Sequence, residues 1–248
     1  MNKLVSAAVV ALALTTGANA TQFIQNGDFA TNGGNGQFNF NTTAAHWYVP
    51  TGSNDSGYAF LYQNGTADTS GAIGEYGNTQ LWGAGNGGLN TIANPPSGAP
   101  AFVALDGDFQ NKPLNQDISG LVVGGSYVVH FDYAYAQQSG FNGDTDQHLT
   151  VSLGGQSFDT PTGTNPSHGF TGWYSTDLTF TATSANETLS FLAYGNLPVP
   201  PFALVTGVTL TGPAVPEPST WAMMLGGFGG LGLAARLRRR RTAAAVVA

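Results

Sequence analysis

Residues 127–135 read Tyr-Val-Val-His-Phe-Asp-Tyr-Ala-Tyr, and this stretch decides the fold class. Every second residue from Tyr127 to Tyr135 is aromatic or β-branched, and the residues between them include His130 and Asp132. An alternation with a period of two is typical of a β-strand that turns one face to a hydrophobic core. The stretch therefore predicts a long strand with a fixed register, because a slip of one residue would expose its aromatic face to water.

The same kind of pattern recurs along residues 101–210. Compact or alternating apolar runs occupy 102–105, 149–153, 178–182, 189–193, 202–204 and 208–210. Gly124-Gly125 predicts a hairpin turn, and Gly154-Gly155 predicts another tight turn. No part of 21–213 shows a helical period. Many short strands separated by Gly and Pro turns indicate an all-β protein, and we predict an antiparallel β-sandwich of the jelly-roll type.

The sequence before this region is less regular. Tyr58, Phe60 and Tyr62 alternate with Ala59 and Leu61, which predicts a half-buried strand. Gly, Asn, Thr and Pro dominate the following stretch, 64–100, in which the isolated large residues are Tyr76, Leu81 and Trp82. This composition predicts long loops.

The first 20 residues predict a secretory signal peptide. Lys3 gives a short positive start, residues 4–14 form an apolar run, and Ala18-Asn19-Ala20 has the small-x-small pattern of a cleavage site. We expect cleavage after Ala20, which leaves a single passenger domain at 21–213. A permanent N-terminal anchor is the alternative, and the short apolar run argues against it.

The C-terminus combines a Pro-Glu-Pro sequence, an uncharged stretch and an arginine cluster, in that order. The uncharged stretch, 221–235, would reach about 22 Å as a helix, which is short of the roughly 30 Å hydrocarbon core of a bilayer. Arg236, by snorkelling, and Leu237 extend it to a marginal span. The arginines predict that this end stays on the cytoplasmic side. We therefore predict a transmembrane helix and a cytoplasmic tail at 242–248.

This tail resembles the PEP-CTERM sorting signal of Gram-negative bacteria, in its PEPxxWA form. The residues that carry the resemblance are Pro216, Glu217, Pro218, Trp221, Ala222, Arg238, Arg239, Arg240 and Arg241. In that family the tail directs an exported protein to an exosortase, a membrane enzyme that cuts near the motif. The resemblance covers 214–241 and implies an exosortase partner and an inner-membrane stage before processing. A plain C-terminal membrane anchor is the alternative.

A second resemblance spans most of the passenger. Short segments are similar to galactose-binding-like and carbohydrate-binding jelly rolls: Asn26–Phe29, Trp47, Gln116–Leu121, Gly125–Tyr127, Phe131–Ala134 and Pro201–Leu204. It implies a jelly-roll fold and a glycan ligand. Ala30 and Val205-Thr206 stand where such domains often carry the acids of a structural calcium site, so the resemblance does not carry that site over.

The charge of the passenger excludes one class of partner. Of seven basic residues in the chain only Lys112 lies within 21–213, against thirteen acidic residues, a net charge of about −12. Binding to nucleic acid needs Lys and Arg to neutralise phosphates, so we exclude it. The chain has no cysteine, which removes disulfides and thiolate chemistry.

Two Asp-x-Asp clusters are the candidate metal ligands. Asp106 and Asp108 form the first, and Asp144 and Asp146 form the second. Carboxylate oxygens are ligands that calcium prefers, so calcium is the cofactor that these clusters predict. The alternative is that these acids cap turns through their own backbone.

Catalytic patterns are missing from the sequence. Glu75 and Glu187 are the only glutamates of the passenger, and neither has a neighbouring acid that would make a glycosidase pair. The motifs of serine hydrolases and zinc proteases do not occur. His130 and Asp132 share one strand face, where they could form a pair or belong to a polar outer face. We therefore predict a protein without catalytic activity.

Tryptophans near loops are the candidate ligand platforms. Trp82 is the strongest of them, and Trp47 and Trp173 are the others, with burial in the core as their alternative. Together these features predict a protein exported by the Sec pathway, held in the inner membrane before processing, and then placed in the envelope or extracellular matrix with polysaccharide. The alternative is a secreted polysaccharide-active enzyme whose active site the sequence does not reveal.

Overall fold

The computed structural model describes residues 21–52, 57–196, 199–213 and Phe228. These form strands β1 to β14 and one short 3-10 helix, η1 (Ala84–Asn86). Within the described part no helix has the length and apolar character to cross a membrane. The residues predicted for the signal-peptide cleavage site and for the C-terminal sorting signal with its transmembrane helix lie outside the described part. They are Ala18, Ala20, Pro216, Glu217, Pro218, Trp221, Ala222, Arg238, Arg239, Arg240 and Arg241.

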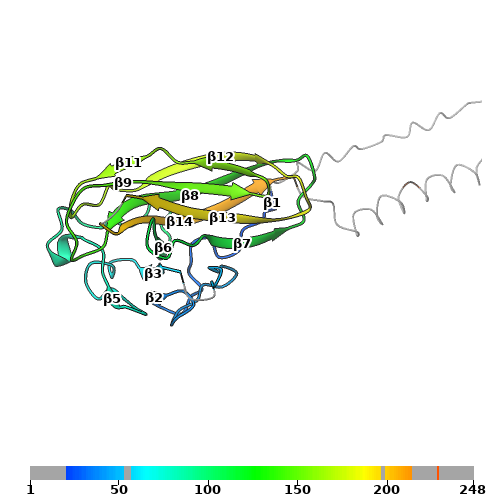
Figure 1. The fold of residues 1–248 in the computed structure, drawn as a ribbon. Helices are drawn as coiled ribbons and strands as arrows, with labels where there is room; N and C mark the ends of the chain where they lie inside the picture. The colour runs from blue at the N-terminus through cyan, green and yellow to red at the C-terminus, as the bar shows by residue number, and fades with distance from the viewer. Residues whose placement is uncertain (1–20, 53–56, 197–198, 214–227, 229–248) are drawn as a thin grey trace, which may run out of the picture.

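The larger sheet is antiparallel and is built around β8 (Ser126–Gln137), which contains the stretch 127–135 (Figure 1). Its strands, in order, are β12 (Tyr174–Thr181), β8, β14 (Pro201–Gly212), β6 (Ala101–Asp106), β3 (Ala59–Gln63) and β2 (Gly36–Gln37). β1 (Thr21–Gln22) pairs with the end of β14, where Thr21 lies opposite Gly212. The first and last strands of the described domain therefore meet at one end of the molecule.

The smaller sheet is also antiparallel. Its strands, in order, are β10 (Gln156–Asp159), β9 (Thr145–Leu153), β13 (Asn186–Gly195) and β7 (Leu114–Ser119), and β11 (Gly163–Asn165) also pairs with β9. The turn predicted at Gly154-Gly155 is confirmed, because Leu153 pairs with Gln156. The hairpin predicted at Gly124-Gly125 is wrong. β7 and β8 belong to different sheets, so this turn carries the chain from one layer to the other.

An inner core lies between the two sheets. It buries the aromatic face predicted for 127–135, and Phe131 of β8 meets Phe191 of β13 at a ring distance of 5.1 Å. Leu149, Val151 and Leu153 of β9 line the same core from the smaller sheet. The predicted all-β sandwich is therefore confirmed, whereas its jelly-roll topology stays a prediction.

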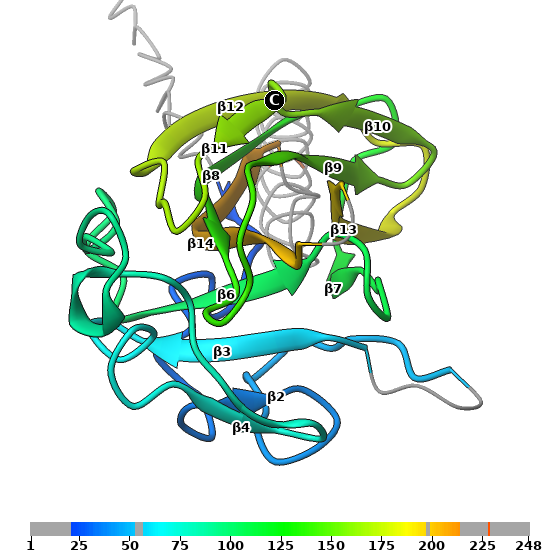
Figure 2. The same ribbon diagram turned by 60° about the vertical axis from the view of Figure 1, so that its left-hand side comes forward.

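An outer core lies on the opposite face of the larger sheet. Phe60 and Tyr62 of β3, Phe102 of β6 and Phe202 of β14 form its base. The stretch 64–100 folds over them, with the hairpin of β4 (Ala72–Gly74) and β5 (Gly77–Thr79) lying near β2, as the cyan and teal ribbon in Figure 2 shows. The half-buried strand predicted around Phe60 is wrong, because the loops bury the second face of β3 as well.

Buried polar side chains hold this loop cover in place. Asp132 of β8 is 1 % exposed, and its carboxylate accepts hydrogen bonds from the Ser97 N–H at 2.8 Å and the Ser175 hydroxyl at 2.5 Å. Gln37 donates to the carbonyl of Gly57 and accepts from the backbone N–H of Glu75 at 2.7 Å. These side chains satisfy backbone groups that no neighbouring strand reaches, which a buried loop requires.

Candidate functional site

A cavity of about 440 Å³ opens where β6 and β8 end and β14 begins. We call it the aromatic cavity, and it is lined by Tyr58, Tyr76, Asn78, Thr79, Asp106, Asp108, Phe109, Gln138, Phe141 and Pro200. Pro200 directly precedes β14, whereas the opposite end of that strand pairs with β1. The cavity and the two ends of the described domain therefore lie at opposite ends of the sandwich.

Aromatic rings dominate its wall. Tyr76 is 60 % exposed, Phe109 is 45 % exposed and Phe141 is 40 % exposed, although each is large and apolar. Tyr76 and Phe109 meet edge to face at 5.5 Å, and Tyr58 lies edge to face with Phe109 at 5.2 Å. The rings hold one another in fixed orientations while they leave apolar surface open to a ligand.

Side-chain hydrogen bonds fix two of these rings further. The Tyr58 and Thr79 hydroxyls lie 3.1 Å apart in a hydrogen bond, and the Gln110 amide donates to the Tyr76 hydroxyl at 3.0 Å. Burial raises the pKa of Tyr58, so its phenol stays neutral at physiological pH. The wall of the cavity is thus largely preformed, which reduces the entropy lost when a ligand binds.

Asp106 is the buried acid of the cavity and is only 2 % exposed. Its Oδ1 atom accepts hydrogen bonds from the backbone N–H groups of Asp108 at 2.8 Å and Phe109 at 2.9 Å. Its Oδ2 atom is buried and has no hydrogen-bond partner among the residues that the structure describes. Burial raises the pKa of Asp106 to about 7, and the two N–H groups offset only part of this effect.

The turn after Asp106 is clamped by backbone contacts from two strands. The Gly107 N–H donates to the Pro201 carbonyl at 2.8 Å, and the Gly107 carbonyl accepts from the Gly195 N–H at 3.1 Å. A Cβ atom on Gly107 would lie 2.6 Å from the Gly195 nitrogen, so only glycine fits there. This clamp sets the direction in which Asp108 and Phe109 project at the cavity.

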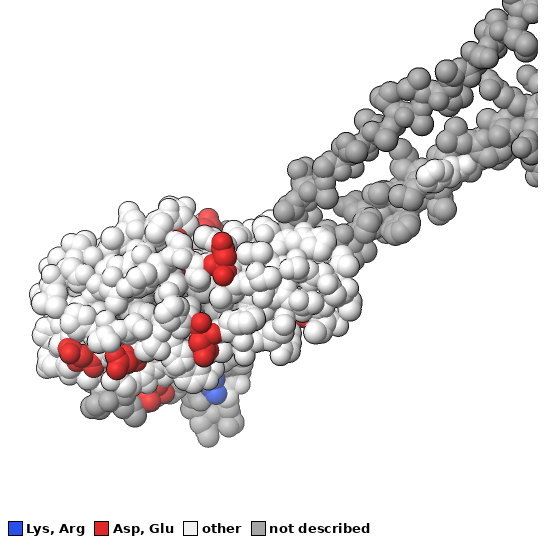
Figure 3. All heavy atoms as spheres, turned by 90° about the horizontal axis from the view of Figure 1, so that it is seen from above, with Lys and Arg blue, Asp and Glu red and all other residues white. Residues whose placement is uncertain are grey.

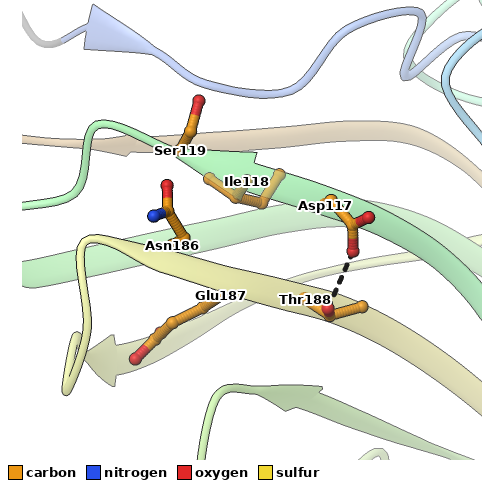
Figure 4. A pocket seen from close by; sticks show the side chains of 6 residues that line it. All are labelled: Asp117, Ile118, Ser119, Asn186, Glu187 and Thr188. Carbon is orange, nitrogen blue, oxygen red and sulfur yellow. Dashed lines mark hydrogen bonds between the residues drawn. The ribbon is translucent and has the colours of Figure 1, made fainter.

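A second hollow, of about 490 Å³, lies at the ends of β7 and β13 (Figure 4). Asp117 and Thr188 are paired on the two adjacent strands, and the Thr188 hydroxyl donates to Asp117 at 2.8 Å, whereas the Glu187 side chain points to the other side of the strand. Glu187 Oε1 accepts from the Thr183 and Ser184 N–H groups and so caps the preceding turn. No aromatic ring lines this hollow among the described residues, so the aromatic cavity is the better candidate for ligand binding.

The structure places the four candidate calcium ligands in two separate settings. Asp106 and Asp108 line the aromatic cavity, as described above. Asp144 accepts from the Ser167 N–H at 2.9 Å, and Asp146 accepts from the Thr164 hydroxyl at 2.7 Å, so both stabilise local structure. The described chain contains no group of three or more His, Cys, Asp or Glu side chains that could hold a metal. Calcium also takes backbone and amide oxygens as ligands, so the role of these four acids as calcium ligands stays a prediction.

The three candidate tryptophans lie outside the cavity lining. Trp47 is buried in the inner core against Phe29 and Phe191. The Trp173 indole donates to the Ala93 carbonyl at 2.7 Å at the edge of the outer core. Their role as ligand platforms stays a prediction.

Trp82 does not line the cavity but contacts the backbone of Phe141, which does. The Trp82 ring lies tilted against the His168 ring at a centroid distance of 4.0 Å, and its indole N–H donates to the Phe141 carbonyl at 2.9 Å. It therefore supports the loop that carries Phe141.

His130 and Asp132 do not form a pair. His130 Nδ1 lies 2.6 Å from Asp177 Oδ1 on the neighbouring strand, where the His130 side chain is partly exposed and that of Asp177 is largely exposed. Asp132 is instead committed to Ser97 and Ser175 beneath the loop cover. Sequence reasoning missed Tyr58, Phe109 and Phe141 as site residues because they come from separate segments that only the fold brings together.

Comparison with known families concerns the C-terminus. Residues 214–240 match a family model described as the PEP-CTERM protein-sorting motif. The chain carries a PEP-CTERM sorting motif. This confirms the prediction made from Pro216, Glu217, Pro218, Trp221 and Ala222 for this segment. The comparison with curated proteins found no match.

Solved structures with similarity to this chain include carbohydrate-binding-module β-sandwiches. The module TmCBM61 in complex with β-1,4-galactotriose is 14 % identical, with 78 % of this chain and 99 % of that chain covered and a TM-score of 0.39. A structure described as CBM4 structure and function is 15 % identical, covering 77 % and 99 %, with a TM-score of 0.33. The Stig cyclase Fisc from Fischerella sp. TAU is 14 % identical, covering 80 % and 100 %, with a TM-score of 0.44.

Proposed function

We propose that this chain is an exported, exosortase-sorted protein whose β-sandwich binds glycan in the aromatic cavity without cleaving it. The sorting part rests on the PEP-CTERM motif at 214–240. The binding part rests on one observation, the open rings of Tyr76, Phe109 and Phe141 around a cavity of about 440 Å³. A sugar ring has an apolar C–H face and polar edges, so aromatic rings flanked by amides and carboxylates suit it on both sides.

The polar groups of the cavity match this geometry. Asn78 and Gln138 bring amides that can donate and accept, and Asp108 brings a carboxylate that accepts only. Sugar hydroxyls need partners of both kinds, and a ligand bound this way would retain its hydrogen bonds on leaving water. We expect a short glycan segment of one to three units, since about 440 Å³ lies within the range of small-molecule sites.

A glycan array with the full-length chain in detergent tests the binding proposal, followed by calorimetry on the glycans that bind. Tyr76→Ala and Phe109→Ala should each weaken binding by roughly tenfold or more, equivalent to about 1.4 kcal/mol of lost stacking. Tyr194→Ala is the matched control, because Tyr194 is 41 % exposed and lies on β13 outside the cavity lining. Binding that depended on Tyr194 and ignored Tyr76 would move the site to the smaller sheet. An array with no binding would overturn the proposal.

One observation favours an enzyme as the second candidate. Asp106 has a pKa of about 7 in a cavity and lies beside Asp108, and a pair of carboxyl groups of which one has a raised pKa is the usual arrangement in glycoside hydrolysis. Incubation of each bound glycan with the chain, followed by chromatography of the products, separates the two candidates. We expect intact glycan. Cleavage that Asp108→Asn abolished would replace the binding proposal with a glycosidase.

The sorting part has its own test, the mass of the intact protein recovered from membrane and matrix fractions. We expect cleavage after Ala20 and near Pro216 in the matrix form. A matrix form that retains residues 214–248 would contradict processing by an exosortase.

A further inference from the structure

We propose that the aromatic cavity selects by charge, accepting neutral and amino sugars and rejecting sugars that carry a carboxylate or sulfate. This inference rests on the proposed function, because it assumes that the aromatic cavity is where glycan binds. It adds the chemical class of the ligand, which the stacking of rings alone does not determine.

The charges around the cavity carry the first step. Two of its described lining residues are acids, Asp106 and Asp108, and none is Lys or Arg. Asp108 is half-buried and its backbone is tied to Asp106, so its carboxylate is confined near the opening. Two like charges 5 Å apart repel by about 1 kcal/mol in water and by about 3 kcal/mol at the effective dielectric near a protein surface. An anionic sugar therefore meets repulsion that its neutral counterpart does not.

The surface beyond the cavity adds to this effect. In Figure 3 acidic side chains are spread over a face that is otherwise mostly uncharged. The passenger sequence has thirteen acids and one base, so its long-range field also disfavours anions. A cavity that binds uronate or sulfated glycans would carry an arginine or lysine to pair with the anion. The described lining has none.

Asp106 supports the second half of the proposal, the tolerance of amino sugars. Within the described part of the chain its buried Oδ2 atom has no hydrogen-bond partner, whereas two backbone N–H groups donate to Oδ1. A buried carboxylate with one unpaired oxygen is stabilised by a nearby positive charge. An ammonium group bound beside Asp108 would supply that charge, whereas an anionic group would add to the repulsion.

A matched set of ligands isolates charge from shape. Each neutral oligosaccharide that binds on the array is compared by calorimetry with its C6-carboxylate, C6-carboxamide and C6-amino derivatives, using the full-length chain. The carboxamide and the carboxylate have nearly the same shape and differ in charge. We expect the carboxylate to bind roughly tenfold more weakly than the carboxamide, and the amino derivative to bind at least as tightly.

Two variants assign the effect to the cavity. Asp108→Asn should reduce the preference for carboxamide over carboxylate to about threefold or less, because it keeps the backbone bond to Asp106 and removes one charge. Asp159→Asn, an exposed acid on β10 outside the lining, should leave the preference unchanged.

The outcomes separate this inference from the proposed function. Carboxylate bound as tightly as carboxamide by the unmodified chain would overturn the inference while glycan binding stands. Equal effects of the two variants would also overturn it, because the discrimination would then come from net charge alone. Failure of every neutral glycan to bind would overturn the proposed function and the inference with it.

Discussion

Each face of the larger sheet carries a buried core, and different means bury the two cores. On the inner face another sheet lies opposite, and apolar residues such as Phe131 and Phe191 meet directly. On the outer face the cover is a loop segment, and buried polar side chains such as Asp132 and Gln37 hold its backbone. The second sheet covers the inner core with regularly paired strands, whereas the irregular loops over the outer core leave space for a cavity. Binding surfaces on loops supported by a rigid sheet are common for this reason.

The first prediction from this comparison is that a Phe→Ala substitution lowers the free energy of unfolding more on the inner face than on the outer face. Phe131 and Phe102 are both at most 1 % exposed, on the inner and outer face respectively. Phe131→Ala should lower the free energy of unfolding by about 3–5 kcal/mol, and Phe102→Ala by about 1 kcal/mol less, because a loop cover can collapse into a void more easily than a sheet. Urea unfolding of both variants measures this. Equal losses would mean that the loop cover is as rigid as the second sheet.

The next largest effect concerns Asp106, which lies at the end of the outer face. Its pKa is about 7 in the folded chain, against an ordinary 3.8. The folded state therefore keeps a proton that the unfolded state loses, so stability is greatest below about pH 4 for this group and falls as the pH rises to about 7. The slope reaches at most roughly 1.4 kcal/mol per pH unit.

Asp106→Asn should remove this slope and leave the variant more stable than the unmodified chain above pH 7. Melting temperatures of both proteins between pH 4 and pH 8 test it, and Asp159→Asn, at an exposed acid on β10 away from the cavity, is the control. Parallel pH curves for Asp106→Asn and the unmodified chain would show that Asp106 titrates normally.

A smaller effect is expected where the loop cover is attached to β8. Asp132→Ala removes the acceptor for the Ser97 N–H and the Ser175 hydroxyl and should cost about 1–3 kcal/mol, because two hydrogen bonds worth about 0.5–1.5 kcal/mol each are lost. Amide hydrogen exchange should speed up in the segment around Ser97 and remain slow in β9. Asp177→Ala is the control, since that carboxylate is exposed and its pair with His130 contributes little. Equal losses from both variants would contradict a specific role for Asp132.

The smallest expected effect concerns the hairpin that carries Tyr76. Gln37→Ala removes the bonds to Gly57 and Glu75 and should cost about 1 kcal/mol of stability. It should also weaken glycan binding several-fold, because Tyr76 lies in the turn of the β4–β5 hairpin. Calorimetry and urea unfolding measure the two effects. Gln156→Ala is the matched control, whose amide oxygen accepts from the Thr181 N–H away from the cavity. Unchanged binding in Gln37→Ala would show that the hairpin needs no support from Gln37.

The inner core could be predicted from the sequence more fully than the outer core. The strand at 127–135 and the alternation at 149–153 predicted the inner core, because their period of two records which side chains face the second sheet. The sequence also identified the C-terminal motif, whose signal is linear. The sequence signal for the outer core is weaker. It consists of the unbroken apolar runs at 102–105 and 202–204, which are typical of strands buried on both faces.

The candidate site was only partly within reach. Asp106 and Asp108 were identified as a pair, but as calcium ligands rather than as acids of an aromatic cavity. The cavity rings come from separate segments and belong to no sequence motif, as Tyr58, Tyr76 and Phe109 show. They come into contact only because of the path that 64–100 takes over the sheet. That path is set by single hydrogen bonds from residues such as Gln37, which have no periodic pattern.

The direction of β14 has a consequence for how the molecule would be displayed. The strand begins beside the aromatic cavity at Pro201 and ends at Gly212, next to the point where the sorting segment begins. Its length of 12 residues separates the two by roughly 35 Å. If the protein is attached through its C-terminal segment, as the proposed sorting requires, the aromatic cavity lies at the end of β14 away from the attachment.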